Sequence, residues 1–235
     1  MESKFLCSLL RRGTNRDAQT LRPVTTNQSR PEGRGFNPII LMNRLLTILL
    51  ALIWSLPLIA AQTDYASHIA SLIDPAKLAT LGKRGANTRV QKAVYWLATA
   101  RKEGEKPAKV LDRAVTLAGY KNRDATKLTK EALLRNLDIA EKLGCLDDAG
   151  LADMKRGKAA TVMKGPYKGD QLSVDHIVPR AVVPELDNVI ANLELMPMRM
   201  NASKNDKIGD RQREMAKRFY QAGLLSKKGL EAVLR

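Results

Sequence analysis

Cysteine and histidine are scarce in this chain. Its 235 residues include two cysteines, Cys7 and Cys145, and two histidines, His68 and His176. Two cysteines are too few for a disulfide framework or for a zinc site built from thiolates. A metal site in this chain would therefore have to use oxygen ligands, with histidine as the available nitrogen donor.

Acidic residues are also few compared with basic ones. The chain has 24 Asp and Glu against 40 Lys and Arg, a formal net charge of +16 that is spread along its length. This balance favours a polyanionic partner such as nucleic acid, with a solvated basic surface or attraction to anionic lipid as alternatives. With 44% apolar residues the chain can build a packed core, which excludes a wholly disordered protein.

The first 61 residues divide into two segments. Residues 1–41 lack apolar periodicity, and we expect them to be a disordered extension. In residues 42–61, Met42-Asn43-Arg44 is followed by an uninterrupted apolar run from Leu45 to Ala61. A short positive start, an apolar middle and small residues at the end are typical of a secretory signal peptide, here cleaved after Ala61 or one residue earlier. The prediction is a secreted or periplasmic protein whose translation starts at Met42.

The apolar run has two other interpretations. If residues 1–41 belong to the protein, residues 45–61 become a membrane anchor at the short limit for spanning, with the part after residue 61 outside the cytoplasm. A buried core helix is disfavoured because the run has no polar face. Without residues 1–61 the chain keeps 32 basic and 21 acidic residues, a balance of +11, so the basic excess does not depend on this segment.

Residues 62–160 predict a helical domain. Apolar residues recur at helical spacing, and Thr88–Gln91 has the pattern of a capping box. We expect Trp96 to be a core residue, because aromatic residues on apolar helix faces are usually buried. We expect His68 to be a surface or packing histidine. The helices that the pattern predicts run over 88–102, 107–118 and 126–143, with a weaker one after Asp147-Asp148.

From residue 161 onward the pattern changes to short strands. Ala160–Met163 and Leu172–Val174 are β-favouring pieces separated by a segment of turn composition, and Asp175-His176 ends the second piece. After a loop, Leu193–Met196 has the alternation of another strand. Asn201 then opens a basic helical stretch. The predicted order is strand, loop, strand and helix, with polar side chains where these elements meet.

The residues at these junctions resemble a known family. The segments Asp175-His176-Ile177-Val178-Pro179, Asn192-Leu193-Glu194-Leu195 and Asn201-Ala202-Ser203-Lys204 resemble the HNH endonuclease family in its H-N-N variant, whose catalytic unit is a ββα-metal finger. The resemblance covers residues 161–222. It implies an HNH-like ββα nuclease domain at 161–235 that includes C-terminal helices. Together with the helical domain that periodicity predicts at 62–160, this gives an expected α+β fold that is mostly α-helical.

The resemblance implies a role for each matched residue. His176 would be the general base that activates a water molecule. Asp175 and Asn201 would be metal ligands. Asn192 would hold the intervening loop by hydrogen bonds, and Lys204 would face a phosphate near the cut.

These residue types also suit phosphodiester hydrolysis on chemical grounds. An imidazole can accept a proton near neutral pH, and one carboxylate with one amide oxygen leaves room for the waters that Mg²⁺ retains. We therefore expect one divalent metal, Mg²⁺ in the first place, with Mn²⁺ or another ion as alternatives. No structural zinc is expected, because Pro197 and Met200 stand where many relatives in that family have cysteines.

The predicted function is that of an exported, metal-dependent endonuclease that hydrolyses DNA in preference to RNA. The alternative is a non-catalytic basic DNA-binding or cell-envelope protein with a finger-like fold. Membrane contact is expected only through residues 45–61 if they are retained, and the sequence gives no indication of an inhibitor protein. The residues expected to contact phosphates without reading base sequence are Arg199, Lys207, Arg211, Arg213, Lys217 and Arg218.

Overall fold

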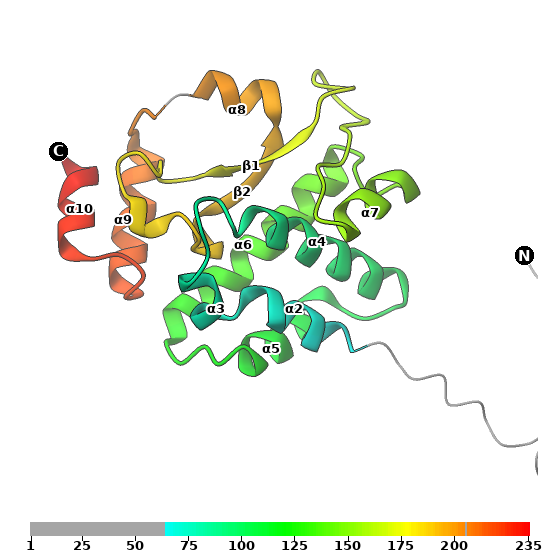
Figure 1. Cartoon of the computed structure of the whole chain (residues 1–235), viewed down its shortest axis with the longest axis horizontal. Helices are drawn as coiled ribbons and strands as arrows, with labels where there is room; N and C mark the ends of the chain where they lie inside the picture. The colour runs from blue at the N-terminus through cyan, green and yellow to red at the C-terminus, as the bar shows by residue number, and fades with distance from the viewer. Residues whose placement is uncertain (1–63, 205) are drawn as a thin grey trace, which may run out of the picture. The chain divides into compact units, whose positions relative to one another are not determined.

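The computed structural model describes residues 64–204 and 206–235, which form helices around one small antiparallel sheet (Figure 1). The expectation of a mostly helical α+β chain is confirmed at this level. The extension predicted at 1–41 and the signal peptide or anchor predicted at 42–61 lie outside the described residues. Of the helices in the described ranges, none has both the length and the apolarity needed to cross a membrane.

Along the chain, helices both precede and follow the two strands of the sheet. Those before it are α2 Tyr65–Ile73, α3 Pro75–Ala79, α4 Asn87–Lys102, α5 Pro107–Leu117, α6 Arg123–Lys142 and α7 Asp148–Lys155. The strands are β1 Leu172–His176 and β2 Leu193–Pro197, with the 3-10 turns η1 Pro184–Leu186 and η2 Ile190–Asn192 between them. The helices after the sheet are α8 Met198–Lys204, α9 Asp210–Gln221 and α10 Lys227–Leu234.

Helices α4 and α5 show which local signals decide helix ends. α4 matches the helix expected over 88–102, but the Thr88 capping box is wrong, because the N-cap is Ala86 without a side-chain hydrogen bond and Gln91 is buried. α5 begins with Pro107 as predicted, since proline suits a first turn where the N–H has no helical partner. It ends ahead of Gly119, whose φ of +78° favours glycine. Proline and glycine therefore set the ends of α5, whereas burial of an apolar face accounts for α4.

Side-chain caps set the starts of the next two helices. The amide oxygen of Asn122 accepts hydrogen bonds from the backbone N–H groups of Asp124 and Ala125. Because these bonds satisfy the first turn, α6 begins three residues before the predicted start at Thr126. Asp147 caps α7 in the same way, and the weak helix expected there is confirmed.

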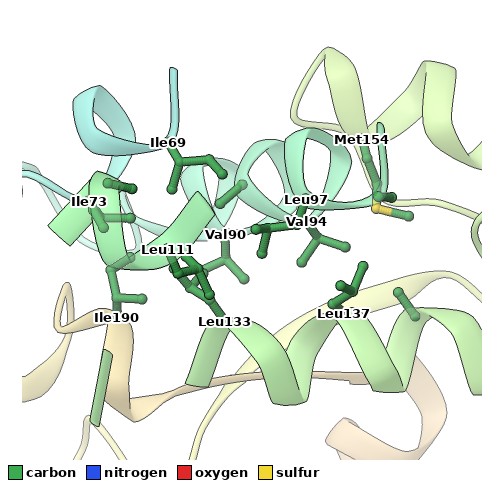
Figure 2. Packing of buried hydrophobic residues seen from close by; sticks show 14 of the residues in the cluster. Ile69, Ile73, Val90, Val94, Leu97, Leu111, Leu133, Leu137, Met154 and Ile190 are labelled. Atoms are coloured by element: carbon green, nitrogen blue, oxygen red, sulfur yellow. The ribbon is translucent and has the colours of Figure 1, made fainter. Parts of the chain in front are cut away.

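One hydrophobic core is shared by the helices and the sheet (Figure 2). It contains side chains from α2, α4, α5, α6 and α7 together with residues of η2 and of both strands. Burying each large aliphatic side chain stabilises the fold by roughly 1.5–3 kcal/mol. The packing thus continues across residue 160, where the sequence suggests a boundary between 62–160 and 161–235. Core residues include Ile69, Ile73, Val90, Val94, Leu97, Leu111, Leu133, Leu137, Met154, Val174, Ile190 and Leu195.

A second buried cluster lies under the loop between the two strands. Phe219 of α9 and Val233 of α10 pack with Val178 and Leu186 of that loop. The inner face predicted for the helix around Phe219 is therefore present in α9. This packing holds the first residues of the loop that follows His176.

The two strands pair antiparallel, with Leu172 opposite Pro197 and His176 opposite Leu193. The predicted second strand is confirmed as β2. Burial alternates along β1, as expected for a strand whose successive side chains point to opposite faces. Because His176 is the last residue of β1, its backbone leaves the sheet at that point and its side chain can turn toward the same space as its neighbour Asp175.

The β-piece predicted at 160–163 is wrong. Within the described residues this segment contributes a single bridge, between Thr161 and Gln171. The backbone N–H groups of Met163 and Lys164 both donate to the carbonyl oxygen of Leu143, at 2.9 and 3.0 Å. The segment therefore satisfies the end of α6, and its hydrogen bonds with Asp170 and Leu172 do not extend into a regular strand.

Asn136 of α6 takes the place of a neighbouring strand at the outer edge of β2. Its amide nitrogen donates to the carbonyl oxygen of Leu193 at 3.0 Å, and its amide oxygen accepts from the N–H of Leu195 at 2.7 Å. The side chain has no exposed surface. A two-stranded sheet is marginal by itself, so this pair of hydrogen bonds joins it to the helical core.

Substituting Asn136 with alanine should lower the free energy of unfolding by about 2–4 kcal/mol, because two buried backbone groups of β2 would lose their partners. Urea denaturation followed by circular dichroism measures this change. Asp138→Ala is the matched control on the same helix: Asp138 is exposed and, among the residues that the structure describes, pairs only with Lys142, so its loss should stay within about 0.5 kcal/mol. Equal midpoints for the two variants would contradict the structural role of Asn136.

Candidate active site

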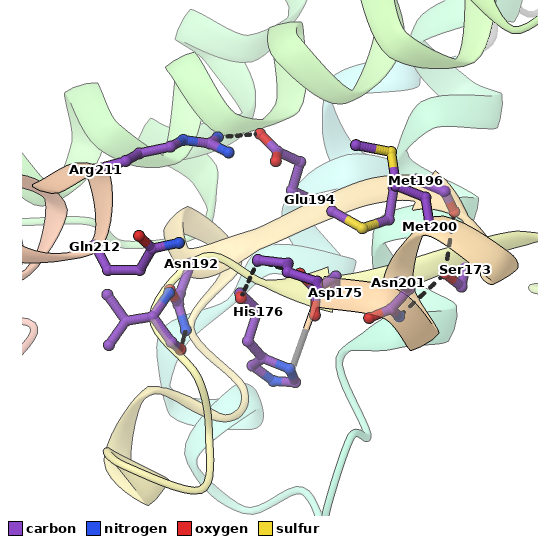
Figure 3. A network of polar contacts seen from close by, with 12 residues as sticks. Ser173, Asp175, His176, Asn192, Glu194, Met196, Met200, Asn201, Arg211 and Gln212 are labelled. Carbon is purple, nitrogen blue, oxygen red and sulfur yellow. Dashed lines mark hydrogen bonds and ion pairs between the residues drawn. The ribbon is translucent and has the colours of Figure 1, made fainter. Parts of the chain in front are cut away.

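A pocket of about 420 Å³ opens where the end of β1 meets α8. It is lined by four of the residues singled out in the sequence: Asp175 and His176 from β1, and Asn201 and Lys204 from α8. Figure 3 shows the first three on these neighbouring elements. The fifth, Asn192, does not line the pocket.

His176 is held by one ring nitrogen. Its Nε2 lies 2.9 Å from the backbone carbonyl oxygen of Asp187 and 3.0 Å from the carboxylate oxygen Oδ1 of the same residue. A carbonyl oxygen can only accept, so Nε2 carries the hydrogen and, in the neutral ring, Nδ1 carries the lone pair. No hydrogen bond within the described residues reaches Nδ1. The ring is 7% exposed, so it is fixed in orientation while one proton-accepting nitrogen stays available.

Asp187 is a site residue that the sequence reading missed. It lies 11 positions after His176, in the loop between η1 and η2, and its side chain is buried to about nine tenths. Arg180, from the same loop, approaches its Oδ1 with Nε at 3.8 Å. Nothing in the local pattern separates Asp187 from other loop aspartates. Its role follows from the way the loop folds back onto the end of β1.

The amide of Asn201 has a defined orientation. The hydroxyl of Ser173 donates to the carbonyl oxygen of Met196 at 3.0 Å, so its oxygen is left to accept the amide hydrogen of Asn201 at 3.1 Å. Nδ2 of Asn201 is therefore committed to Ser173, and Oδ1 is turned to the opposite side. In Figure 3 this oxygen faces the side on which Asp175 lies.

Lys204 forms an ion pair with the carboxylate of Asp175. Its ammonium group forms an ion pair with Oδ2 of Asp175 and also donates to the backbone carbonyl oxygen of His176 at 3.0 Å. Both side chains are largely buried, with 22% of Lys204 and 16% of Asp175 exposed. The negative charge of Asp175 is thus balanced by a flexible lysine in this arrangement, which a second cation could displace.

The donor chemistry of the pocket fits a hard divalent cation. The carboxylate of Asp175 and the free amide oxygen of Asn201 are oxygen ligands of the type that Mg²⁺ and Mn²⁺ accept with additional waters. Over the described ranges, no group of three or more His, Cys, Asp or Glu side chains is placed to hold a metal. Cys145, the cysteine within the described residues, is fully buried in the core. Burial raises its pKa to about 11, which keeps it protonated at neutral pH.

Asn192 lies behind the pocket and organises the loop. Its Oδ1 accepts from the N–H of Val178 at 2.8 Å, and its Nδ2 donates to the carbonyl oxygens of Val178 and Leu186 at 3.0 and 3.3 Å. It is completely buried. The structure therefore places this residue in contact with the loop that carries Asp187 and apart from the space open to a substrate.

Helix α8 differs from the prediction in both its start and its end. It begins at Met198, ahead of Asn201, because Oδ2 of Asp170 accepts from the N–H of Arg199 at 2.8 Å and so caps the first turn. Hydrogen bonds from the backbone N–H groups of Arg199 and Gln171 hold the pKa of Asp170 below its usual range. The helix ends at Lys204, and α9 is a separate element. Asn201 and Lys204 consequently lie on one short helix next to β1.

Two arginines enclose the carboxylate of Glu194 on β2. Oε1 of Glu194 lies 2.9 Å from Nε of Arg135 and 2.6 Å from Nη2 of Arg211. Figure 3 shows the contact with Arg211. The hydrogen bond to Glu194 raises the pKa of Arg211, whereas burial lowers the pKa of Arg135. Arg211, predicted to contact phosphate, is therefore already engaged within the chain and joins α9 to the sheet.

The other predicted phosphate contacts fall into two groups. Three arginines approach carboxylates of the chain itself, whereas Lys207 and Lys217 are exposed and form no ion pair within the described residues. An arginine that keeps its carboxylate partner contributes less net charge to an anionic ligand. The two lysines are thus the freer cations of this set. The paired arginines are Arg199 with Asp170, Arg213 with Asp210 and Arg218 with Glu131.

Comparison with known proteins finds no matching family model, no matching curated protein and no matching solved structure.

Proposed function

We propose that the chain is a metal-dependent endonuclease of the HNH type, with β1, β2 and α8 as its ββα finger. The observation that carries this proposal is the contact of His176 Nε2 with the carbonyl oxygen of Asp187, which leaves Nδ1 without a partner within the described residues, in a pocket shared with Asp175 and Asn201. A histidine oriented by a hydrogen bond on one nitrogen, with the other free to accept a proton, is the arrangement that a general base requires.

The residues of the pocket divide the work of phosphodiester hydrolysis. Nδ1 of His176 takes a proton from water as the water oxygen forms a bond to phosphorus and the bond from phosphorus to the leaving oxygen breaks. A solvent proton then neutralises the leaving oxygen, and the imidazolium returns its proton to water. Lys204 offers positive charge to the phosphate oxygens. When bound by Asp175 and Asn201, a divalent cation supplies further counter-charge to the transition state.

The proposed substrate is DNA, attacked with little base specificity outside the cytoplasm. The net charge of +16 supports binding to a polyanion through its backbone, and of the six predicted phosphate contacts Lys207 and Lys217 are exposed and form no ion pair within the described residues. Export depends on residues 42–61 acting as a signal peptide. Retention of residues 45–61 would instead give a membrane-anchored nuclease.

A second candidate is a non-catalytic basic DNA-binding or cell-envelope protein that uses a finger-like fold. The ion pair between Lys204 and Asp175 favours it, because a lysine that permanently neutralises Asp175 would exclude a metal from that carboxylate. The two candidates differ in whether a divalent cation displaces this lysine.

Incubation of the purified protein with supercoiled plasmid should give nicked or linear DNA with Mg²⁺ or Mn²⁺ and intact DNA with EDTA. Asp175→Ala and Asn201→Ala should each lower the initial rate by about 100-fold or more, because each removes an oxygen ligand from the counter-charge of the transition state. The exposed carboxylate variant Asp138→Ala should stay within about twofold of the parent protein. Retarded but uncut plasmid in every lane would favour the non-catalytic candidate.

A further inference from the structure

We propose that Arg84, in the loop between α3 and α4, contacts the scissile phosphate, so that the helical part supplies a residue of the active site. Arg84 lines the same pocket as Asp175 and His176, although it belongs to a segment far from both in the sequence. Because its partner would be the substrate of the nuclease proposed above, this role rests on that function. It assigns the helical part a task beyond support of the sheet.

The backbone of Arg84 is tied to the residue that orients the general base. Oδ2 of Asp187 accepts from the N–H of Arg84 at 3.1 Å, while Oδ1 of the same carboxylate meets Nε2 of His176 at 3.0 Å. The carboxylate of Asp187 therefore contacts both Arg84 and His176, and the fold fixes the position of the Arg84 backbone relative to the His176 ring. A phosphate contact needs such a fixed position to favour the transition state.

The neighbouring Asn188 fastens the rest of this loop. Its amide oxygen accepts from the N–H of Ala86 at 3.1 Å, and its amide nitrogen donates to the carbonyl oxygens of Leu81 and Gly82, each at 3.1 Å. The loop that carries Arg84 is thus bound on both sides of that residue by Asp187 and Asn188. An exposed side chain on a clamped backbone is suited to reach a ligand without a large ordering cost.

The charge of Arg84 is free for an external anion. Three cations line the pocket, and two of them have carboxylate partners: Lys204 pairs with Asp175, and Arg180 approaches Asp187. Arg84 has no carboxylate within ion-pair distance in the described part of the chain. A guanidinium presents paired N–H donors that match two phosphate oxygens, so a phosphodiester is the ligand class that fits it.

The backbone conformation of Arg84 is also unusual for a residue with a side chain. Its φ is +57°, and no other non-glycine residue within the described ranges has a positive φ. This region disfavours side chains other than glycine, and strained positions of this kind cluster at functional sites. Glycine occurs next to it at Gly85 and two positions before it at Gly82, yet position 84 keeps an arginine.

The test compares Arg84→Ala, Arg84→Lys and Arg84→Gly with the neighbouring cation variant Lys83→Ala. Arg84→Ala should lower kcat/KM for plasmid cleavage by about 100-fold, with roughly a tenfold recovery in Arg84→Lys. Arg84→Gly should lose as much activity as Arg84→Ala while its melting temperature is unchanged or higher, because glycine relieves the left-handed backbone. Lys83→Ala should remain within about twofold, since Lys83 does not line the pocket.

Binding separates a failure at Arg84 from a failure of the proposed function. In EDTA, the salt dependence of affinity for a fluorescent DNA duplex should become shallower by about 0.9 in log–log slope for Arg84→Ala, the loss of one phosphate contact. A cutting parent protein with unchanged Arg84→Ala kinetics, or equal losses in Arg84→Ala and Lys83→Ala, would overturn the role of Arg84 and leave the nuclease intact. If the parent cuts nothing, the nuclease fails, and an unchanged slope would then overturn the phosphate contact as well.

Discussion

Replacing His176 with alanine should lower the initial rate of plasmid cleavage by about 10³-fold, because the reaction would lose its general base. The structure ties Nε2 of this ring to Asp187 and leaves Nδ1 without a partner within the described residues, so no second group stands ready to take the proton from water. The measurement is the loss of supercoiled plasmid with time in Mg²⁺. DNA affinity in EDTA should change little, since the role proposed for His176 is to take a proton from water and not to contact the DNA backbone.

The other histidine of the chain provides the matched control. His68 is exposed and its ring stacks on Trp96 at a centroid distance of 4.1 Å and an interplanar angle of 3°. This agrees with the expectation of a surface or packing histidine, while Trp96 packs half-buried against the core. His68→Ala should keep cleavage within about twofold of the parent. A His176→Ala protein that folds normally and keeps more than about a tenth of the rate would exclude His176 as the general base.

Replacing Asn192 with alanine should lower the free energy of unfolding by about 3–5 kcal/mol, because three buried backbone groups would each lose a hydrogen bond, and of these only the carbonyl of Leu186 would keep another donor among the described residues, the N–H of Val189. These groups are the N–H and carbonyl of Val178 and the carbonyl of Leu186. Urea denaturation at 10 °C measures the change. At temperatures where the variant remains folded, cleavage should also fall, because the loop that holds Asp187 against His176 would no longer be fixed.

Asn122→Ala is the control for this result, because it makes the same substitution at the surface. Asn122 is exposed and caps α6 through two hydrogen bonds, so its replacement should cost about 1 kcal/mol. Asn192→Asp is a second comparison, since aspartate keeps the acceptor for Val178 but cannot donate to either carbonyl. If Asn192→Ala and Asn122→Ala were equally stable and Asn192→Asp matched the parent protein, Asn192 would not be the residue that organises the loop.

Elements with short-range signals could be predicted from the sequence. Pro107 and Gly119 bound α5, Asp147 begins α7, and the alternation of 193–196 becomes β2. The errors occur where a distant group competes with the local signal. Thr88 does not cap α4, because the helix already begins at Asn87. The segment 160–163 bonds the end of α6, and Asp170 starts α8 ahead of Asn201. In each case a tertiary hydrogen bond or burial outweighed a propensity of a few tenths of a kcal/mol per residue.

The sequence by itself determined the chemistry that the site can offer: one histidine in a strand–loop–strand–helix pattern, oxygen ligands in place of thiolates, and an excess of positive charge. Only the tertiary structure decided which groups act on that histidine. Asp187 reaches His176 through a folded loop, Arg84 donates to Asp187 from 103 positions away, and Asn136 joins the sheet to α6. Such contacts leave no periodic trace in the chain, because they depend on the packing of whole elements and not on the conformational preference of neighbouring residues.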